Sequence, residues 1–261
     1  MSKVTEMPIE KKAEPIDENL SNDDKASVKP PHKGIYLLPN LFTTAALFAG
    51  FYAIIAAMNG DFIHASVAIF IAMILDGLDG RVARMTGTQS AFGAEYDSLS
   101  DMVSFGVAPA LISFTWVLSP LGKIGWVAAF IYVVGAALRL ARFNTMLGVE
   151  EKRYFTGLPS PAAAAIIAGI IWAANSQGVA PDDIKYLMAF VVPAVGLLMV
   201  SNVKYRSFKD LNMKGKVSFI KLVAVVLLLV LVTIEPDLIL ASVFVIYGLS
   251  GLIGYMMRKL S

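Results

Sequence analysis

Residues 74–101 read ILDGLDGRVARMTGTQSAFGAEYDSLSD, and the rest of the chain is interpreted around this stretch. The chain as a whole is 57% apolar, whereas soluble domains are nearer to about half. Ionisable residues within apolar membrane segments are costly to bury, so their presence indicates a functional site. Four aspartates lie in the stretch: Asp76, Asp79, Asp97 and Asp101.

Long apolar runs alternate with short polar breaks along most of the chain. A helix of about 20 apolar residues crosses the ~30 Å hydrocarbon core of a bilayer. Continuous apolar runs, rather than strands of alternating polarity, favour helices over a barrel. The sequence therefore predicts an all-α, polytopic transmembrane helical bundle with eight spans. The predicted spans are 37–58, 62–85, 95–118, 124–147, 161–177, 184–202, 218–234 and 238–257.

The distribution of lysine and arginine predicts the topology of these spans. The breaks after the odd-numbered spans hold few basic residues, whereas the opposite side holds many, among them Arg84, Arg142 and Lys204. Basic loops stay on the cytoplasmic side of a membrane. Both termini are therefore predicted to be cytoplasmic, in a multi-pass protein of the inner (cytoplasmic) membrane. The aspartate-rich stretch then faces the cytosol.

Composition also predicts the domain organisation. Residues 1–33 are rich in charge, proline and serine and have no apolar segment, so we expect a disordered cytoplasmic tail and no secretory signal peptide. Residues 34–204 form a predicted six-span core, and residues 205–261 add two C-terminal spans. The absence of cysteine excludes disulfides and thiolate metal sites. A net charge of +2 gives no strong field for a polyanion, so no nucleic acid partner is expected.

The four aspartates have the spacing of a metal site. Asp76 and Asp79 are three residues apart and Asp97 and Asp101 four apart, so each pair lies on one helix face. The small residues of 87–93 allow a turn that brings the two faces together. Converging carboxylates need neutralising cations. Oxygen ligands favour Mg²⁺ or Mn²⁺ over zinc, and two ions about 4 Å apart suit phosphoryl transfer.

Three residues beside Asp79 suit a nucleotide phosphate. Gly80 lets a bulky ligand approach the backbone, and Ala83 is small one turn further on. Arg84 can direct its guanidinium at a phosphate. The alternative is that the aspartates form surface ion pairs with Arg81 and Arg84 at the end of a span. Four aspartates at this spacing, interleaved with glycine and arginine, favour the site.

The pattern D-x2-D-G-x2-A-R-x8-G-x3-D-x3-D of residues 76–101 resembles the signature of the CDP-alcohol phosphatidyltransferase family at every position. The resemblance implies a helical membrane enzyme, a homodimer, that moves a phosphatidyl group from a CDP-linked lipid to an alcohol and releases CMP. It implies that the four aspartates surround a pair of divalent ions and that Asp101 is the general base. It further implies that Gly80 and Ala83 lie against the nucleotide and that Arg84 contacts phosphate.

Three other segments bear on the acceptor alcohol: LPNLFT at 38–43, ALRLARFN at 137–144 and FTGLPSP at 155–161. Together they resemble the membrane-integral, bacterial and archaeal type of phosphatidylserine synthase, from about residue 37 to residue 204. This resemblance implies CDP-diacylglycerol as donor, reached laterally among the membrane lipids, and L-serine as acceptor. The alternative acceptors are glycerol 3-phosphate, inositol phosphate and choline.

Five residues outside the signature are candidates for substrate binding. Asn40 and Thr43 could lie near the nucleotide, and the alternative role is to cap a helix start. Arg139, Arg142 and Asn144 could bind the acceptor, for example the carboxylate of L-serine. Their alternative role is anchoring of a span on the basic side of the membrane.

Two other classes of protein fit the sequence less well than an enzyme. A metal transporter that used the aspartates as an ion path would carry acidic residues throughout the depth of the bilayer. The predicted spans four to eight have none in their interiors. A purely structural membrane protein would leave the complete signature unexplained.

Overall fold

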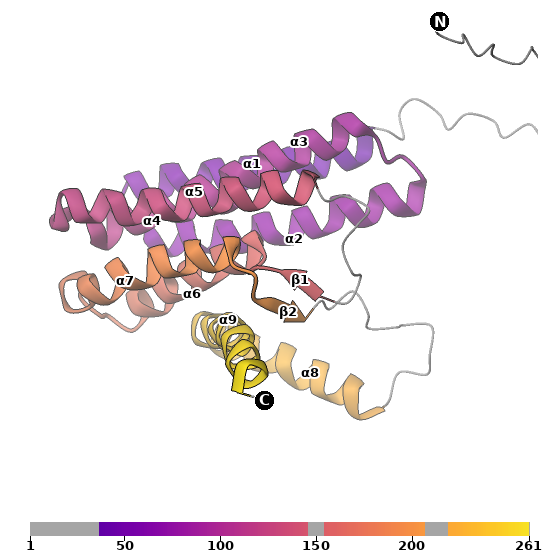
Figure 1. The fold of residues 1–261 in the computed structure, drawn as a ribbon. Coiled ribbons are helices and arrows are strands. Elements are labelled where there is room, and N and C mark those ends of the chain that lie inside the picture. The colour runs from indigo at the N-terminus through magenta and orange to yellow at the C-terminus, as the bar shows by residue number, and fades with distance from the viewer. Residues whose placement is uncertain (1–36, 146–153, 207–218, 261) are drawn as a thin grey trace, which may run out of the picture. The chain divides into compact units, whose positions relative to one another are not determined.

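The computed structural model describes residues 37–145, 154–206 and 219–260, and helices dominate these ranges (Figure 1). The predicted tail, residues 1–33, lies outside them. The long helices are α1 (Leu37–Met58), α2 (Phe62–Thr86), α3 (Ala91–Asp101), α5 (Lys123–Thr145), α6 (Ser160–Ser176), α7 (Pro181–Val200), α8 (Phe219–Ile234) and α9 (Pro236–Leu260).

The helix that begins with α3 continues beyond Asp101 in a different winding. A π-helical turn, η2 (Met102–Val107), follows directly, and then α4 (Ala108–Ser113). A second π-helical turn, η3 (Phe114–Leu118), and a 3₁₀ turn, η4 (Ser119–Leu121), complete it. The sequence predicts one helix for this span. The structure confirms its continuity but not its regular α-helical winding.

The predicted all-α membrane bundle is confirmed. Within the described ranges, six helical segments are long and apolar enough to cross a membrane. The helices α6 and α8 fill the other two predicted spans but have only 17 and 16 residues, fewer than the about 20 that a span needs. Figure 1 shows α9 almost end-on while α2, α5 and α7 are seen from the side, so α9 crosses these helices.

Small residues build the core of the bundle. The facing sides of α1 and α2 bury mainly alanines, such as Ala53, Ala57 and Ala68. Helix α6 is buried along most of its length, and Gly169 has no room for a Cβ against Ala241 of α9. Small residues let membrane helices approach closely enough for dispersion contacts to hold them, because lipid gives no hydrophobic drive between helices.

Helix α1 packs directly against the helix that carries the second aspartate pair. The Ser100 hydroxyl donates to the Thr43 carbonyl (3.2 Å) and the Ser104 hydroxyl to the Ala46 carbonyl (3.2 Å). A Cβ on Gly50 would lie only 2.7 Å from the Ser104 Cα, so glycine is required for this approach. The start of α1 is thereby held beside the aspartates.

A two-stranded antiparallel ribbon joins the end of the bundle. Strand β1 (Tyr154–Thr156) pairs with β2 (Lys204–Arg206), and Phe155 lies opposite Tyr205. The sequence interpretation contains no strand, because three-residue strands are too short to give a periodic signal. The ribbon connects the start of α6 with the chain beyond α7.

Candidate active site

The turn between α2 and α3 brings the two aspartate pairs face to face. Gly87 ends α2 in the left-handed conformation (φ 64°), and its N–H bonds to the Ala83 carbonyl. Ser90 caps α3, and its hydroxyl oxygen accepts a hydrogen bond from the Gly93 N–H (3.0 Å). The turn expected at residues 87–93 is therefore present, with a glycine end and a serine start.

Three of the four aspartates converge. Asp76 from α2 and Asp97 and Asp101 from α3 each offer a carboxylate oxygen, and these oxygens lie within 4.8 Å of one another. All three side chains are partly buried, and Asp97 Oδ1 has no hydrogen-bond partner among the described residues. Like charges so close together need a cation. An unpartnered buried oxygen and an all-oxygen donor set fit a hard divalent ion.

Asp79 is not one of these three residues, although it lies close enough to interact electrostatically with Asp76 and Asp97. It is buried, and its Oδ2 accepts a hydrogen bond from the Thr43 hydroxyl at 2.7 Å. The same hydroxyl lies 3.2 Å from the Pro39 carbonyl, at the start of α1. Thr43 is itself buried, so its hydroxyl bridges α1 and α2 away from solvent. The contact holds the Oδ2 oxygen of Asp79 and leaves its Oδ1 oxygen available to a ligand.

A cavity of about 360 Å³ opens beside Asp79. Asp97 lines this cavity and also belongs to the three-carboxylate group, so the two features adjoin. Every residue proposed from the sequence for the nucleotide lines it: Asn40, Thr43, Gly80, Ala83 and Arg84.

Glycines shape the walls of this cavity. The nearest atom to a Cβ on Gly80 would be Arg84 Nη1 at 3.5 Å, so Gly80 leaves space in front of the guanidinium. A Cβ on Gly93 would lie 3.1 Å from Ser90 Oγ and 3.5 Å from Asn40 Oδ1. Asn40 is thus close to the start of α3, as a residue at the mouth of a nucleotide site would be.

Two further residues of the cavity, Thr88 and Gln89, were not singled out from the sequence. They occupy unspecified positions of the signature, where the pattern alone carries no signal. Their location in the turn that closes α2 against α3 is what brings them to the cavity wall.

The arginines of α5 lie outside this cavity. Arg139 Nη1 donates to Ser160 Oγ at 2.7 Å, and Ser160 is fully buried. The Arg139 guanidinium also interacts electrostatically with Asp76 and Asp101. Arg139 therefore lies on the side of the carboxylate group that faces α6.

The other two acceptor candidates have protein partners. Arg142 Nη1 donates to Asn202 Oδ1 at 3.2 Å. The Asn144 amide donates to Ser98 Oγ at 3.1 Å, beside Asp97. A small recess separates the α5 arginines from the ribbon, and it is lined by Arg139, Arg142, Phe143, Phe155 and Thr156.

A model of the CDP-alcohol phosphatidyltransferase family matches residues 36–201, which include the whole carboxylate group and cavity. The chain belongs to this family of membrane enzymes.

Similar proteins with known names are found in bacteria and archaea. A Helicobacter pylori protein named CDP-diacylglycerol–serine O-phosphatidyltransferase is 38% identical over 220 residues, which are 84% of this chain and 92% of the relative. A Methanocaldococcus jannaschii protein of the same name is 39% identical over 197 residues, 75% of this chain and 88% of the relative. An archaetidylserine synthase of Methanothermobacter thermautotrophicus is 34% identical over 170 residues, 64% and 69% of the two chains.

Proposed function

We propose that this chain is a membrane-integral enzyme that transfers the phosphatidyl group of CDP-diacylglycerol to L-serine and releases CMP. One observation carries the proposal: Asp97 is shared by a cavity of nucleotide size and a carboxylate group suited to divalent cations. A nucleotide in that cavity would present its pyrophosphate to the cations. The names of the relatives supply the acceptor.

The donor would be held by residues of three helices. The cytidine nucleotide would lie against Gly80 and Ala83, with Asn40 and Thr43 at its α1 side. Arg84 would contact phosphate with the donor geometry that guanidinium groups favour. The diacylglycerol chains would extend into the surrounding lipid.

The metal ligands would be the four aspartates of the signature. Asp76, Asp97 and Asp101 form the convergent group, and Asp79 is oriented by Thr43. Two Mg²⁺ or Mn²⁺ ions, when bound, would neutralise the pyrophosphate and the charge that develops on the leaving CMP.

The transfer is proposed as a direct displacement. The oxygen of the serine hydroxyl forms a bond to the lipid-side phosphorus, and the bond from that phosphorus to the bridging pyrophosphate oxygen breaks. The hydroxyl proton goes to the Asp101 carboxylate, and CMP leaves with the bridging oxygen. Because a carboxylate close to cations is a weak base, close positioning of the hydroxyl must supply much of the rate.

The acceptor is proposed to bind on the Arg139 side of the carboxylates. Arg139 is the α5 residue that interacts with Asp76 and Asp101, so its guanidinium could attract the L-serine carboxylate close to Asp101. Arg142 and Asn144 would complete this side. The same basic residues would suit a phosphorylated acceptor, so glycerol 3-phosphate and inositol phosphate are retained, with choline, as the alternatives.

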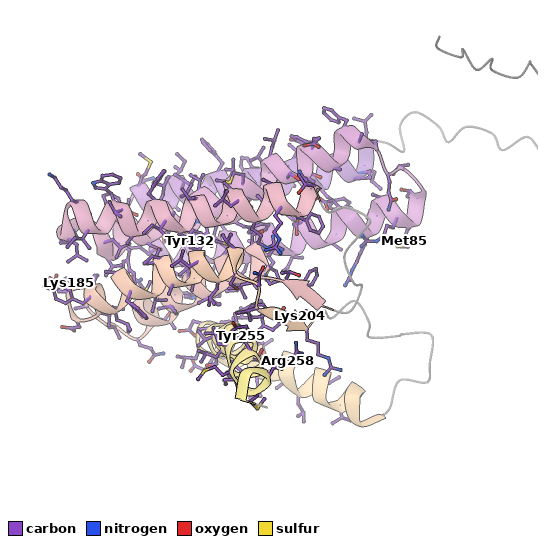
Figure 2. All side chains as sticks on the ribbon, in the orientation of Figure 1. Met85, Tyr132, Lys185, Lys204, Tyr255 and Arg258 are labelled. Carbon is purple, nitrogen blue, oxygen red and sulfur yellow. The ribbon has the colours of Figure 1, made fainter. Side chains whose placement is uncertain are left out.

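The proposed orientation places the site at the cytoplasmic face of the inner membrane. Figure 2 shows Met85, next to the α2–α3 turn, at the opposite end of the helices from Lys185. Lys204 lies nearer to the Met85 end. Arg84 precedes Met85 in the chain, and the excess of basic residues in the sequence is on this side, which supports a cytosolic site. The cytoplasmic termini and the eight spans are proposed from the sequence alone.

We also propose two features of the organisation of the chain. One is the division of the chain into a core of residues 34–204 and an addition of residues 205–261; the boundary falls within β2. The other is the homodimer implied by the family resemblance, which light scattering of the detergent-solubilised protein would test.

The test of the function is CMP release by purified protein in detergent with CDP-diacylglycerol and Mn²⁺ or Mg²⁺. L-serine, glycerol 3-phosphate, inositol phosphate and choline would be compared as acceptors, and we expect release with L-serine. Release with one of the others alone would overturn the acceptor assignment. Asp101→Asn should abolish turnover but retain binding of the nucleotide lipid. Asp182→Asn, at the exposed start of α7, is the matched control and should behave as the native protein.

A further inference from the structure

Tyr205 of β2 connects the ribbon to α9. Its side chain is almost completely buried, and its hydroxyl donates to the Gly248 carbonyl at 3.1 Å. Its ring centroid lies 5.6 Å from that of Tyr247. A Cβ on Gly251 would overlap the Tyr205 ring, so glycine is required there. The tyrosine ring therefore occupies a slot on α9 that Gly251 leaves open, and its hydroxyl is bonded to the Gly248 carbonyl.

The ribbon links Tyr205 to the start of α6. Phe155 of β1 lies opposite Tyr205, and the Gly157 N–H donates to the Val203 carbonyl at 2.8 Å. The next residue, Leu158, is fully buried, and its N–H donates to the Leu198 carbonyl at 3.0 Å. Gly157 has φ 82° and no room for a Cβ against the Met199 carbonyl. The backbone from β2 to α6 is thus fixed by hydrogen bonds and close packing.

Ser160, the first residue of α6, is where this path reaches the candidate site. Its buried hydroxyl accepts the 2.7 Å hydrogen bond from Arg139, which in turn interacts with Asp76 and Asp101. The ribbon also contributes Phe155 to the recess beside Arg139. A shift of the ribbon would therefore move both the Arg139 contact and the recess wall.

We propose that Tyr205 is a positioning residue through which α9 sets the location of Arg139 on the acceptor side of the site. The inference rests on the proposed function, because it assigns Arg139 to the acceptor. It concerns residues beyond 36–201, the segment that the family model matches. It gives the C-terminal helix a role in acceptor affinity, while the donor cavity is lined by residues of α1, α2, α3 and the turn between α2 and α3, with none from β2 or α9.

The test compares Tyr205→Phe and Gly251→Ala with the native full-length protein. Tyr205→Phe keeps the ring and removes one hydrogen bond, which corresponds to about two- to tenfold in an affinity. We expect the KM for the acceptor to rise by that factor, and by more in Gly251→Ala. The KM for CDP-diacylglycerol and the Mn²⁺ concentration for half-maximal rate should stay unchanged. Because Tyr205→Phe is conservative, it keeps the test decisive if Gly251→Ala fails to fold.

Gly125→Ala is the matched control. A Cβ there would overlap the Leu118 carbonyl, so this variant strains the packing of α5 about 21 Å along the helix from Arg139. It should lower thermal stability and leave the acceptor KM at the native value. An unchanged acceptor KM in Tyr205→Phe, or equal rises in the KM of donor and acceptor, would overturn the positioning role. The native protein's choice of acceptor is measured separately, so use of an acceptor other than L-serine would refute the acceptor assignment, not this coupling.

Discussion

Replacing Thr43 by valine tests whether the Thr43–Asp79 hydrogen bond serves the reaction. The two side chains have nearly equal volume, so the variant keeps the packing and removes the hydroxyl, with its 2.7 Å contact to Asp79 Oδ2 and its longer 3.2 Å contact to the Pro39 carbonyl. Both residues are buried, so water cannot replace the lost donor easily. A hydrogen bond to a charged group contributes about 1.5–3 kcal/mol. Since about 1.4 kcal/mol is tenfold, kcat/KM should fall by roughly ten- to a hundredfold if Asp79 is oriented by this bond during transfer.

The assay is CMP release at varied CDP-diacylglycerol, repeated over a Mn²⁺ titration. Thr43→Ser restores the hydroxyl without the methyl group and is the matched control; it should remain within about threefold of the native kcat/KM. Thermal unfolding of each variant shows whether a loss reflects the fold. If Thr43→Val is as active as Thr43→Ser at every Mn²⁺ concentration, Asp79 does not depend on Thr43 and the reasoning is refuted.

Three other outcomes follow from the site and the ribbon. Loss of an outer-shell partner weakens metal binding by about tenfold or more. Asp97→Asn should therefore raise the Mn²⁺ concentration for half-maximal rate by at least about tenfold. An unchanged value would exclude Asp97 as a ligand. Ser90→Ala should lower the free energy of unfolding by about 1 kcal/mol through loss of the α3 cap, with Ser90→Asp as the stable control. Burial raises the pKa of Tyr205 to about 12. Its phenolate absorbance, measured as native minus Tyr205→Phe, should therefore develop above the usual tyrosine pKa of about 10, and a difference that titrates near that value would contradict its burial.

The helical part of the fold was predictable because each membrane helix corresponds to one long apolar run in the sequence. The predicted span 37–58 coincides with α1, and 62–85 ends one residue before α2 does. The ribbon of β1 and β2 was not predictable. Its pairing depends on a tertiary meeting of residues about fifty apart, and its strands of three residues have no period to detect.

The site was predictable where spacing within one helix places side chains. Asp97 and Asp101, four apart, do share a face, and Asp76 joins them across the turn. The hydrogen bond of Asp79 is made with Thr43, which comes from a third helix, and no spacing within the signature contains that information. In the same way, the partners of Arg139 and Arg142, Ser160 and Asn202, lie on later elements that only the folded chain brings close.

The π-helical turn after Asp101 explains how one helix can serve both the site and the core. In an α-helix each residue advances by about 100°, so one additional residue in a turn rotates everything beyond it by roughly that angle. Ahead of the turn, Asp97 and Asp101 face Asp76 of α2. Within the turn, the Phe105 carbonyl accepts a 3.0 Å hydrogen bond from the buried Tyr132 hydroxyl of α5. The Phe105 carbonyl is available for that bond because the residue four positions later is Pro109, which has no N–H to donate to it. Without this rotation, a helix whose carboxylates faced α2 would present a different face to α1 and α5 in its next turns. The change of winding begins at Met102, directly after the proposed general base Asp101, and so allows both contacts.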